Sequence, residues 1–446
     1  MESLWRKQEK VLPAKDNKGS LGVKDTHREV IVVGAGLAGL LIAYYLKEQG
    51  KQVLVLEADE VASGQTERTT AKITSQHGLK YSQLAQTMGI KKARMYARAN
   101  EAAIREYERL IQKREIDCQF ERVPAYLYTL QKEDPLREEA ELAASFGIDA
   151  FFTKETELPF PVTGAVCFRN QAQFSPLKFV RHLALELEIW EHTKVMAVRG
   201  NRVVTKKAAL TADHIVIATH YPILNVPGFY FLRQHQERSY VLALSGCKKI
   251  EGMYLGVDSD GLSLRQAGDM LLLGGGDCRT GENKNGGAYA FLEQAAKQYF
   301  PDGKEETRWA AQDCMPHDGV PFIGRYSIFT PRLYVATGFQ KWGMTSSMLA
   351  ALILRDELCG TKNPYAALFS PQRIHVRASV KKLFIDIGVS VKGIWRGTFV
   401  KKAPRCPHMG CELVWNPDEK SWDCPCHGSR FDADGKLLDN PAKRDR

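Results

Sequence analysis

The first third of the chain shows short apolar runs separated by a helical apolar pattern. Residues 30–33 (VIVV) and 52–57 (QVLVLE) are rich in β-branched and aliphatic side chains, which is typical of buried strands. Residues 37–50 carry apolar positions at helical spacing and end at Gly50, a residue suited to helix C-termini. This strand–helix–strand order predicts an α/β unit built on a parallel sheet.

Similar patterns recur downstream and predict a second layer. Residues 212–222 (ADHIVIATHYP) predict a strand that ends in a small-residue turn, and residues 332–358 predict a strand, a glycine turn and a long helix beginning near Met344. Residues 81–115 and 133–145 have helical spacing, whereas residues 232–273 alternate as antiparallel strands do. The run Gly274–Gly276 is interpreted as a hairpin or bend, because polar residues follow it instead of a helix.

Length and composition set the broad class. The chain has 446 residues, which suits two or three domains, and it is 44% hydrophobic and 26% charged. No apolar run approaches the roughly 18 to 20 residues of a membrane span, and the first residues lack the apolar core of a signal peptide. We therefore expect a soluble, cytoplasmic protein. Six cysteines without paired spacing are interpreted as small buried side chains (Cys118, Cys167, Cys247, Cys278, Cys314 and Cys359).

The net charge of +10 is concentrated locally. Between Pro371 and Arg405, nine Lys or Arg residues face one acid, Asp386. Such a stretch can attract nucleic acid or an acidic partner, but no nucleic-acid motif accompanies it. We expect a solvated linker and strand edges here, and no nucleic-acid partner.

A dinucleotide-binding fingerprint joins the first predicted strand to the first helix. Gly34, Gly36 and Gly39 form GxGxxG, which allows a tight turn, a close backbone approach to a pyrophosphate and close helix–strand packing. The helix N-terminus offers N–H groups to the phosphates. Glu57, at the end of the second strand, can accept hydrogen bonds from ribose hydroxyls and repels a 2′-phosphate. FAD and NAD both use this unit, but no second such motif opens a helix elsewhere, so no separate NAD(P)H site is expected.

Four cysteines and two histidines crowd the C-terminal end in "CPHMGCELVWNPDEKSWDCPCHGS". The spacing Cys406-x-His408 and Cys424-x-x-His427 could hold zinc. Zinc fingers, however, usually pair Cys with Cys and His with His. One thiolate and one imidazole from each half suit a binuclear iron cluster in which one iron takes both thiolates and the other both imidazoles.

The sequence from about Arg28 to Leu358 resembles FAD-dependent oxidoreductases of the D-amino-acid oxidase type. The resemblance rests on GAGLAG with Glu57, "SGQTERTTAKIT" (63–74), "IVIAT" (215–219), "DGVPFIG" (318–324) and "TGFQKWGM" (337–344). It implies covalent or non-covalent FAD and removal of hydride from a carbon bonded to nitrogen. Carried over by position, the residues expected to hold FAD are Gly34, Ala35, Gly36, Leu37, Ala38, Gly39, Glu57, Ala58, Ser63, Gly64, Thr69, Thr70, Ala71, Lys72, Val195, Gly338, Trp342, Gly343, Met344 and Thr345.

Substrate-binding residues are less defined by this resemblance. Many amino-acid-oxidising relatives carry an Arg a few residues before "DGxPxIG", and Asp313 stands at about that place here. An acid there favours a cationic amine over a carboxylate. No catalytic residue is identified; the candidates are Trp342, Asp313 and Tyr240, and further possible pocket residues are Arg265, His220 and His317.

The tail resembles Rieske [2Fe–2S] proteins of the respiratory type, on "CPHMGC" and "CPCHGS". The resemblance implies that Cys406, His408, Cys424 and His427 bind the cluster and that Cys411 and Cys426 form a disulfide. The family's proline loop matches "NPA" at 440–442. Two departures are evident: Phe431 stands where high-potential members have a Tyr that donates to the cluster, and the supporting β layer looks short.

The whole chain thus resembles bacterial flavoproteins that end in a Rieske domain. We expect a leader (1–27), a Rossmann-like FAD region with a helical and antiparallel substrate layer (28–370, the layer at about 81–160 and 230–310), a basic linker (371–384) and a small all-β Rieske domain (385–446). The leading hypothesis is a dehydrogenase that oxidises a small substrate at a C–N bond and passes electrons through the cluster to an external one-electron acceptor. Two alternatives stay open: a reductase fed by a ferredoxin-like donor, and a redox sensor.

Overall fold

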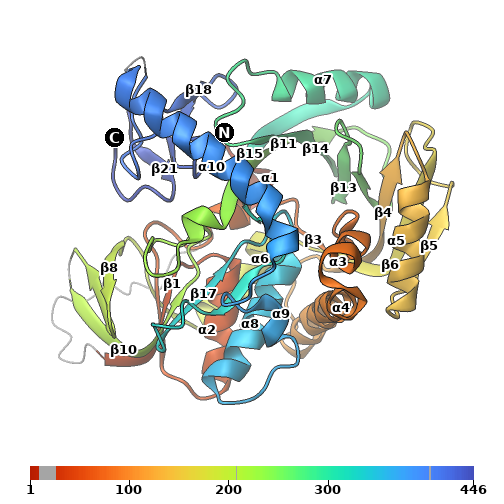
Figure 1. Ribbon diagram of the computed structural model, residues 1–446. Helices are drawn as coiled ribbons and strands as arrows, with labels where there is room; N and C mark the ends of the chain where they lie inside the picture. Colours follow the sequence, from red (N-terminus) through yellow and green to blue (C-terminus); the bar gives the residue numbers. More distant parts are fainter. Residues whose placement is uncertain (10–26, 207, 401–402) are drawn as a thin grey trace.

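The computed structural model describes residues 1–9, 27–206, 208–400 and 403–446. Within these ranges the chain forms two large sheets and one small sheet, of eight, nine and four strands. Helices pack on the first large sheet and flank the second, and the small sheet lies beside the second one (Figure 1). This arrangement agrees with the predicted α/β class and with a small all-β unit at the C-terminal end.

The first sheet has the order β16-β17-β10-β1-β2-β7, and β8 and β9 extend it from β10. Its central strands β10, β1 and β2 run parallel. Both faces are covered: Ile31 and Val33 lie in one apolar cluster, and Val30 and Val32 lie in another. The continuous apolar run in the sequence follows from this burial on two faces. The bounds are β1 (His27–Val33), β2 (Val53–Leu56), β7 (Glu188–Trp190), β8 (Val195–Arg199), β9 (Arg202–Thr205), β10 (Ala209–Ile217), β16 (Phe322–Arg325) and β17 (Leu333–Thr337).

Two apolar helices cover one face of this sheet. Helices α2 (Leu37–Glu48) and α8 (Gly343–Leu358) contact each other, and α2 packs on β1 and β2. The helix expected near Met344 begins at Gly343. Both helices begin beside the end of a parallel strand, so their N-termini point toward the same edge of the sheet. The other helices of this part are α4 (Ile90–Lys113), α6 (Pro176–Leu185) and α9 (Ala366–Phe369).

The second sheet has the order β15-β11-β14-β13-β12-β4-β6-β3, with β5 beside β6. It forms the expected antiparallel layer, apart from the parallel pair β12 and β4. Helices α3 (Lys80–Met88), α5 (Asp134–Ser145) and α7 (Ala288–Tyr299) accompany it. Its strands are β3 (Lys72–Ile73), β4 (Glu121–Thr129), β5 (Ala150–Thr153), β6 (Gly164–Gln173), β11 (Gln234–Ser245), β12 (Met253–Gly256), β13 (Ser263–Ala267), β14 (Met270–Arg279) and β15 (Lys304–Pro316).

One local prediction in this layer is confirmed with an added break, and another is wrong. The helical stretch 81–115 is two helices, because Gly89 between them has φ +89° and ends α3. The glycine run 274–276 lies inside β14, and the pairing of β11 with β14 shifts register between Arg238 and Tyr240. It is therefore a bulged strand and not a hairpin, since glycine tolerates the positive φ that a bulge requires.

The segments at the two ends differ from expectation as well. Residues 1–9 are not a detached leader: helix α1 (Leu4–Gln8) buries Leu4 and Trp5 in the main core, and the Trp5 indole donates to Thr69 O at 2.7 Å. The rest of the predicted leader, 10–26, lies outside the described residues. The basic stretch is not a linker with strand edges, because most of it forms helix α10 (Val376–Phe399).

The small sheet has the order β18-β19-β20-β21, all antiparallel. Its strands are two or three residues long: β18 (Val414–Asn416), β19 (Ser421–Asp423), β20 (Arg430–Phe431) and β21 (Leu437–Asp439). A compact apolar cluster that includes Cys406, Cys411, Cys424, Cys426 and Phe431 lies against it. Among the described residues, no helix is both long and apolar enough to cross a bilayer.

Candidate functional site

A cavity of about 820 Å³ lies between the two large sheets. It is lined by the turn after β1, the end of β2, the 63–72 segment and the start of α8, together with strands β11, β14 and β15. Of the residues expected to hold FAD, the cavity is lined by Gly34, Gly36, Leu37, Ala38, Glu57, Ala58, Ser63, Gly64, Thr69, Thr70, Lys72, Val195, Gly338, Trp342, Gly343 and Met344. Segments far apart in the sequence therefore meet in one space that is large enough for a dinucleotide.

The first glycine turn has no room for side chains. A Cβ on Gly34 would lie 2.6 Å from Ala218 O, and one on Gly39 would lie 1.9 Å from Gly34 O. The Glu57 carboxylate closes the turn by accepting from Ala35 N at 2.7 Å and from Asp59 N at 3.0 Å. Burial raises the pKa of Glu57 against the lowering effect of these N–H groups. The turn thus matches the expected dinucleotide unit in detail.

Four of the residues expected at FAD do not line the cavity. Gly39 packs under the turn and Ala35 binds Glu57 through its backbone. Ala71 is fully buried, and the Thr345 hydroxyl contacts Thr74 O at 3.2 Å. These residues pack behind the ones that line the cavity. The sequence pattern could not separate them from the lining, because neighbouring residues of one motif face opposite sides.

Two acids and a lysine lie in one part of the cavity wall. Asp313 and Asp277 line it together with Lys341, whose ammonium contacts Asp277 Oδ2 at 2.5 Å and Glu237 Oε2 at 3.4 Å. Burial raises the pKa of Asp313 to about 7, although Lys341 works against this. Three carboxylates thus surround one lysine. Asp313, the acid that the sequence places before "DGVPFIG", thus lies in the cavity wall near other charged groups.

The other two catalytic candidates have structural partners. Trp342 lines the cavity and stacks on His77, with ring centroids 4.5 Å apart. Tyr240 is fully buried, and its hydroxyl oxygen accepts from Asn283 Nδ2 at 2.9 Å and lies 3.3 Å from Asn416 Nδ2. Tyr240 thus lines the cavity, while its hydroxyl faces the C-terminal domain.

Arg265 and His317 are not pocket residues. The Arg265 guanidinium donates to Ala71 O at 3.0 Å and to Phe174 O at 3.0 Å, and it lies over the Trp5 ring. It therefore fixes the 63–72 segment from behind. His317 Nε2 lies 2.6 Å from Asp386 Oδ2, so this histidine faces helix α10 and not the cavity. By contrast, His220 lines the cavity, and its buried Nε2 has no partner among the described residues.

The expected cluster ligands converge at the C-terminal end. The loops 406–411 and 424–429, here called the cluster loops, each close on a backbone hydrogen bond: Cys406 N to Cys411 O and Cys424 N to Ser429 O, both 2.8 Å. A side-chain hydrogen bond with Cys424 lowers the pKa of the Cys406 thiol to about 7. The rings of His408 and His427 lie 5.0 Å apart at 89°.

The surroundings of the His408 and His427 ring nitrogens show whether these residues suit a cluster. The Nδ1 atoms of His408 and His427 are buried and have no hydrogen-bond partner in the described part of the chain. Burial lowers the pKa of His408 to about 4 and that of His427 to about 3, so both rings are neutral at pH 7. Unpartnered buried polar atoms are costly in proteins. Two neutral imidazoles and two thiols that converge in this way are the donor set that a [2Fe–2S] cluster of this kind requires.

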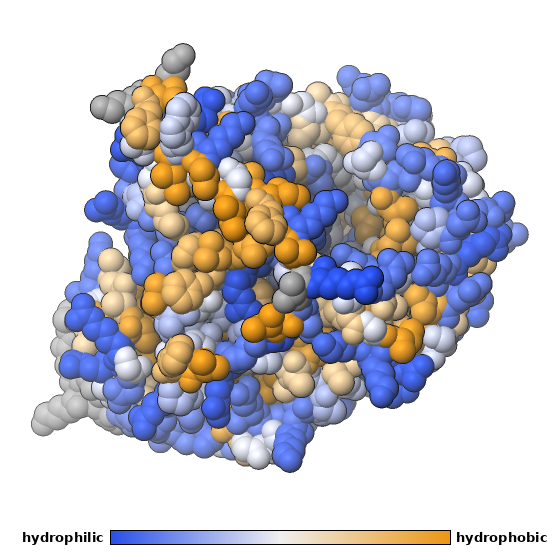
Figure 2. Space-filling view, viewed as in Figure 1, coloured by the Kyte–Doolittle hydropathy of each residue, from blue (hydrophilic) through white to orange (hydrophobic). Residues whose placement is uncertain are grey.

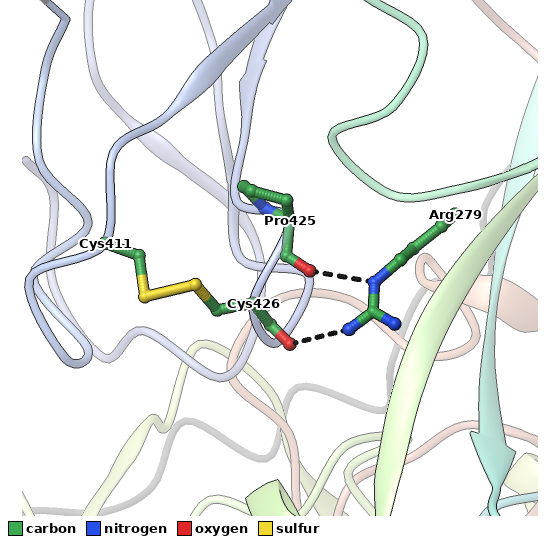
Figure 3. Close-up of a disulfide and its surroundings, with 4 residues drawn as sticks. All are labelled: Arg279, Cys411, Pro425 and Cys426. Atoms are coloured by element: carbon green, nitrogen blue, oxygen red, sulfur yellow. Dashed lines mark hydrogen bonds between the residues drawn. A yellow bond between two sulfur atoms is a disulfide. The ribbon is translucent and has the colours of Figure 1, made fainter. Parts of the chain in front are cut away.

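A disulfide joins the two cluster loops. Cys411 and Cys426 are bonded, and both are buried (Figure 3). Arg279, at the end of β14, reaches across and donates to Pro425 O at 3.0 Å and to Cys426 O at 3.3 Å (Figure 3). Gln236 of β11 donates to His427 O at 2.7 Å and to Asn440 O at 3.0 Å. The substrate-layer sheet thus supports the loops from one side.

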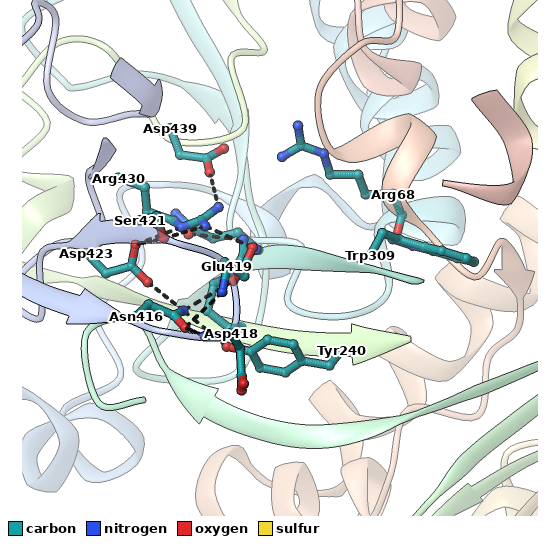
Figure 4. Close-up of polar contacts among 12 residues, drawn as sticks. Arg68, Tyr240, Trp309, Asn416, Asp418, Glu419, Ser421, Asp423, Arg430 and Asp439 are labelled. Atoms are coloured by element: carbon teal, nitrogen blue, oxygen red, sulfur yellow. Dashed lines mark hydrogen bonds and ion pairs between the residues drawn. The ribbon is translucent and has the colours of Figure 1, made fainter. Parts of the chain in front are cut away.

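A buried ionic network fastens the small sheet to the same layer. Arg430 pairs with Asp423, Asp439 and Glu419, and Glu419 also pairs with Arg238 of β11 (Figure 4). All of these side chains are buried or nearly so. The strands of the C-terminal domain are short and form few contacts with one another. The ion pair with Arg238 of β11 gives this domain a buried polar partner from the neighbouring sheet.

The C-terminal domain also forms part of the cavity wall. Asp439, Asn440 and Lys443 line the same space as the glycine turn and the start of α8. Nearby, His408 Nε2 lies 3.0 Å from Asn225 Oδ1, and the His427 ring contacts Phe231 edge-on at 5.8 Å. Asn440 belongs to the "NPA" segment that resembles the family's proline loop, but no local pattern in residues 432–445 predicts that they line this cavity.

Family models match both parts of the chain. The model described as FAD dependent oxidoreductase matches residues 29–357, and the model described as Rieske [2Fe-2S] domain matches residues 382–445. A putative Rieske 2Fe-2S iron-sulfur protein, YhfW of Bacillus subtilis, is 34% identical over 94% of this chain and 92% of its own length. The cytochrome b6-f complex iron-sulfur subunit 2 of Trichormus variabilis is 51% identical over 39 residues, 9% of this chain and 22% of that protein.

Solved structures show the same fold for the flavoprotein part. Glycine oxidase from Geobacillus kaustophilus has a TM-score of 0.66 at 18% identity, over 78% of this chain and 99% of that one. L-proline dehydrogenase from P. horikoshii has a TM-score of 0.66 at 16% identity, over 78% and 98%. Together with the cavity and the cluster loops, these matches make the protein an oxidoreductase that binds FAD and a Rieske [2Fe–2S] cluster. The chain belongs to the FAD dependent oxidoreductase family and carries a Rieske domain at its C-terminal end.

Proposed function

We propose that this protein is a dehydrogenase that oxidises a small cationic amine at its C–N bond and passes the electrons through the Rieske cluster to an external one-electron acceptor. The observation that carries the proposal is the shared cavity wall. Asp439, Asn440 and Lys443 of the cluster domain line the space that the FAD-binding turn opens into. A cluster domain in this position suits electron exchange with the flavin within one molecule.

The carboxylates near Lys341 support an amine as substrate. Asp313 and Asp277 line the cavity near Lys341, and Glu237 contacts that lysine from outside the lining, so carboxylates outnumber the ammonium group at this place. The Asp313 carboxylate, with its pKa raised to about 7, is suited to bind an ammonium group and to accept a proton from its nitrogen. The substrate C–H bond then breaks with loss of hydride while a C=N bond forms. When bound, FAD supplies the two-electron acceptor and the cluster supplies the one-electron carrier.

Known relatives of the fold support the same chemistry. The similar structures include glycine oxidase, L-proline dehydrogenase and an L-amino acid deaminase from Proteus vulgaris, whose TM-score is 0.64 at 18% identity over 82% of this chain and 97% of that one. Their substrates carry a carboxylate beside the amine. The three carboxylates around Lys341 lead us to expect that this chain prefers amines without one.

An anaerobic substrate screen tests the proposal. Holoprotein is mixed with primary, secondary and tertiary amines, with matched amino acids and with hydroxy compounds, and the flavin absorption is followed. Bleaching by amines, followed by reduction of the cluster in its electron paramagnetic resonance spectrum, supports the proposal. Bleaching by hydroxy compounds alone refutes the C–N assignment. A cluster potential well below that of the flavin would favour inward flow from a ferredoxin-like donor instead.

A further inference from the structure

Helix α10 exposes a continuous apolar stripe. Along its 24 residues, large apolar side chains recur every three or four positions and face solvent: Val380, Phe384, Ile387, Val391, Ile394, Trp395 and Phe399. Phe384 is 69% exposed, Trp395 58% and Phe399 70%. Figure 2 shows apolar side chains gathered along this helix on the viewed face. A helix on a globular protein ordinarily turns such a stripe inward.

The orientation of α10 is fixed by its inner face. A Cβ on Gly393 would lie 2.6 Å from Cys426 Sγ, and one on Gly397 would lie 2.3 Å from Gly410 O, so the helix backbone lies directly on the cluster loops. Asp386, also on this face, pairs with Arg279 and with His317. Rotating the helix to bury its aromatic residues would place bulky groups against the loops and break these buried pairs. The apolar stripe therefore faces outward because of specific contacts.

Positive charges border the stripe. Arg377, Lys381, Lys392 and Arg396 of α10 are exposed, although Arg396 also pairs with Glu412, and Asp386 is the one acid of this helix and is buried. The 3-10 turn η2 (Tyr230–Leu232), which contacts α10, adds the exposed side chains of Phe229 and Leu232 next to it. We call α10 and these two residues the α10 face. Apolar and aromatic side chains flanked by basic ones are typical of helices that lie in the interface of an anionic bilayer.

We propose that the α10 face docks this protein on the surface of an anionic lipid bilayer, with α10 lying parallel to the membrane plane. Charge complementarity selects this occupant over a second copy of the chain. In a symmetric dimer formed through α10, the four exposed basic side chains of each copy would face those of the other, and like charges repel. A phosphatidylglycerol surface attracts the same residues, while the Phe and Trp side chains enter the acyl boundary. The helix lies on the membrane and does not cross it.

Docking would bring the cluster to the lipid surface. Since α10 packs directly on the cluster loops, an electron acceptor held at the membrane would meet the domain from which electrons leave. This consequence rests on the proposed function, but the docking itself does not. Binding to vesicles can therefore succeed or fail independently of any turnover.

Vesicle flotation of the holoprotein tests the docking. We expect it to float with vesicles of phosphatidylcholine mixed with phosphatidylglycerol, to stay in solution with phosphatidylcholine alone, and to be released by high salt. Combining Phe384→Ser, Trp395→Ser and Phe399→Ser should abolish flotation. Combining Lys381→Glu and Lys392→Glu should weaken binding by more than about thirtyfold, since each basic residue near an anionic surface contributes about 1 kcal/mol and the introduced acids are repelled as well.

The matched control is Leu130→Ser combined with Leu185→Ser, which removes two exposed apolar side chains outside the α10 face. It should bind vesicles as the unaltered protein does. Flavin absorption and cluster circular dichroism verify that each variant is folded, and the charge variant keeps the test valid if the apolar one misfolds. The proposal is overturned if the protein fails to float with the vesicles that contain phosphatidylglycerol. It is also overturned if the control variant loses binding as much as the apolar variant does. A dimer that the apolar variant abolishes, without vesicle binding, would assign the face to a second copy.

Discussion

At the residue scale, single side chains determine what the cavity accepts and how the cluster is tuned. Asp313 was identified from its place before "DGVPFIG", and the structure places it in the cavity wall. Lys341 and Asp277 could not be found in that way. Asp277 lies in β14 and Lys341 lies in the turn between β17 and α8, and only the tertiary fold brings them together.

The raised pKa of Asp313 predicts a pH profile for activity. A carboxyl with a pKa of about 7 is neutral below pH 7 and charged above it. We therefore expect kcat/KM for a cationic amine to rise through pH 7 and then level off. Asp313→Asn should remove this inflection and lower the plateau at least about tenfold, because a charge-assisted hydrogen bond is lost. Asp269→Asn, at an exposed ion pair, is the control. A profile unchanged in Asp313→Asn would show that Asp313 does not bind the substrate.

Phe431 predicts a shift in the cluster potential. It is fully buried in the apolar cluster that contains Cys406 and Cys424, and it stands where a donor hydroxyl is expected in high-potential members. Phe431→Tyr should raise the midpoint potential, since a hydrogen bond to a cluster sulfur stabilises the reduced, more negative state. A spectroelectrochemical titration measures this. Leu437→Ile, at a partly buried neighbour, should leave the potential unchanged, and an unchanged value in Phe431→Tyr would refute the hydrogen-bond argument.

At the element scale, the periodic parts of the fold were predictable and the irregular ones were not. The apolar run of β1, the glycine turn and α2 follow directly from local sequence. The helix break at Gly89 and the bulge in β14 depend on single glycines whose φ the apolar pattern does not reveal. The basic residues of 371–405 predict a solvated linker, whereas the apolar residues among them have the spacing of a helix. Helix α10 follows from this apolar spacing and not from the charge.

Strand β14 and the cluster loops are joined most directly by Arg279. Burial alone would raise the pKa of Asp386, but hydrogen bonds from His235 and His317 and the charge of Arg279 hold it well below its usual value. Arg279→Ala leaves this acid and two loop carbonyls short of a donor. We expect the free energy of unfolding to fall by about 3 kcal/mol, as when one partner of a buried ion pair is removed.

Denaturant titration followed by cluster circular dichroism checks the Arg279 prediction. Lys249→Ala is the matched control, because its ion pair with Asp269 is fully on the surface and should contribute little to stability. If Arg279→Ala costs no more than Lys249→Ala, the cluster loops do not depend on β14 for their stability.

At the scale of the whole molecule, the two cofactor parts form one structural unit. The sequence predicted both parts from strong local motifs, but it could not predict how they meet. The contacts of Gln236, Gln312 and Arg238 with the C-terminal domain join residues 116 or more positions apart in the chain. Such pairings depend on side-chain packing and buried charge, which no local periodicity encodes. Because of them, a short Rieske sheet is sufficient: the substrate layer supplies its missing support.

The central claim is that electrons pass from the flavin to the cluster within this chain. Its most direct test is anaerobic photoreduction of the flavin in the holoprotein at several protein concentrations, with the cluster followed by electron paramagnetic resonance. The account predicts that the cluster becomes reduced as the flavin is reoxidised, at a rate that does not depend on protein concentration. A flavin that stays reduced beside an oxidised cluster, or a rate proportional to protein concentration, would contradict it.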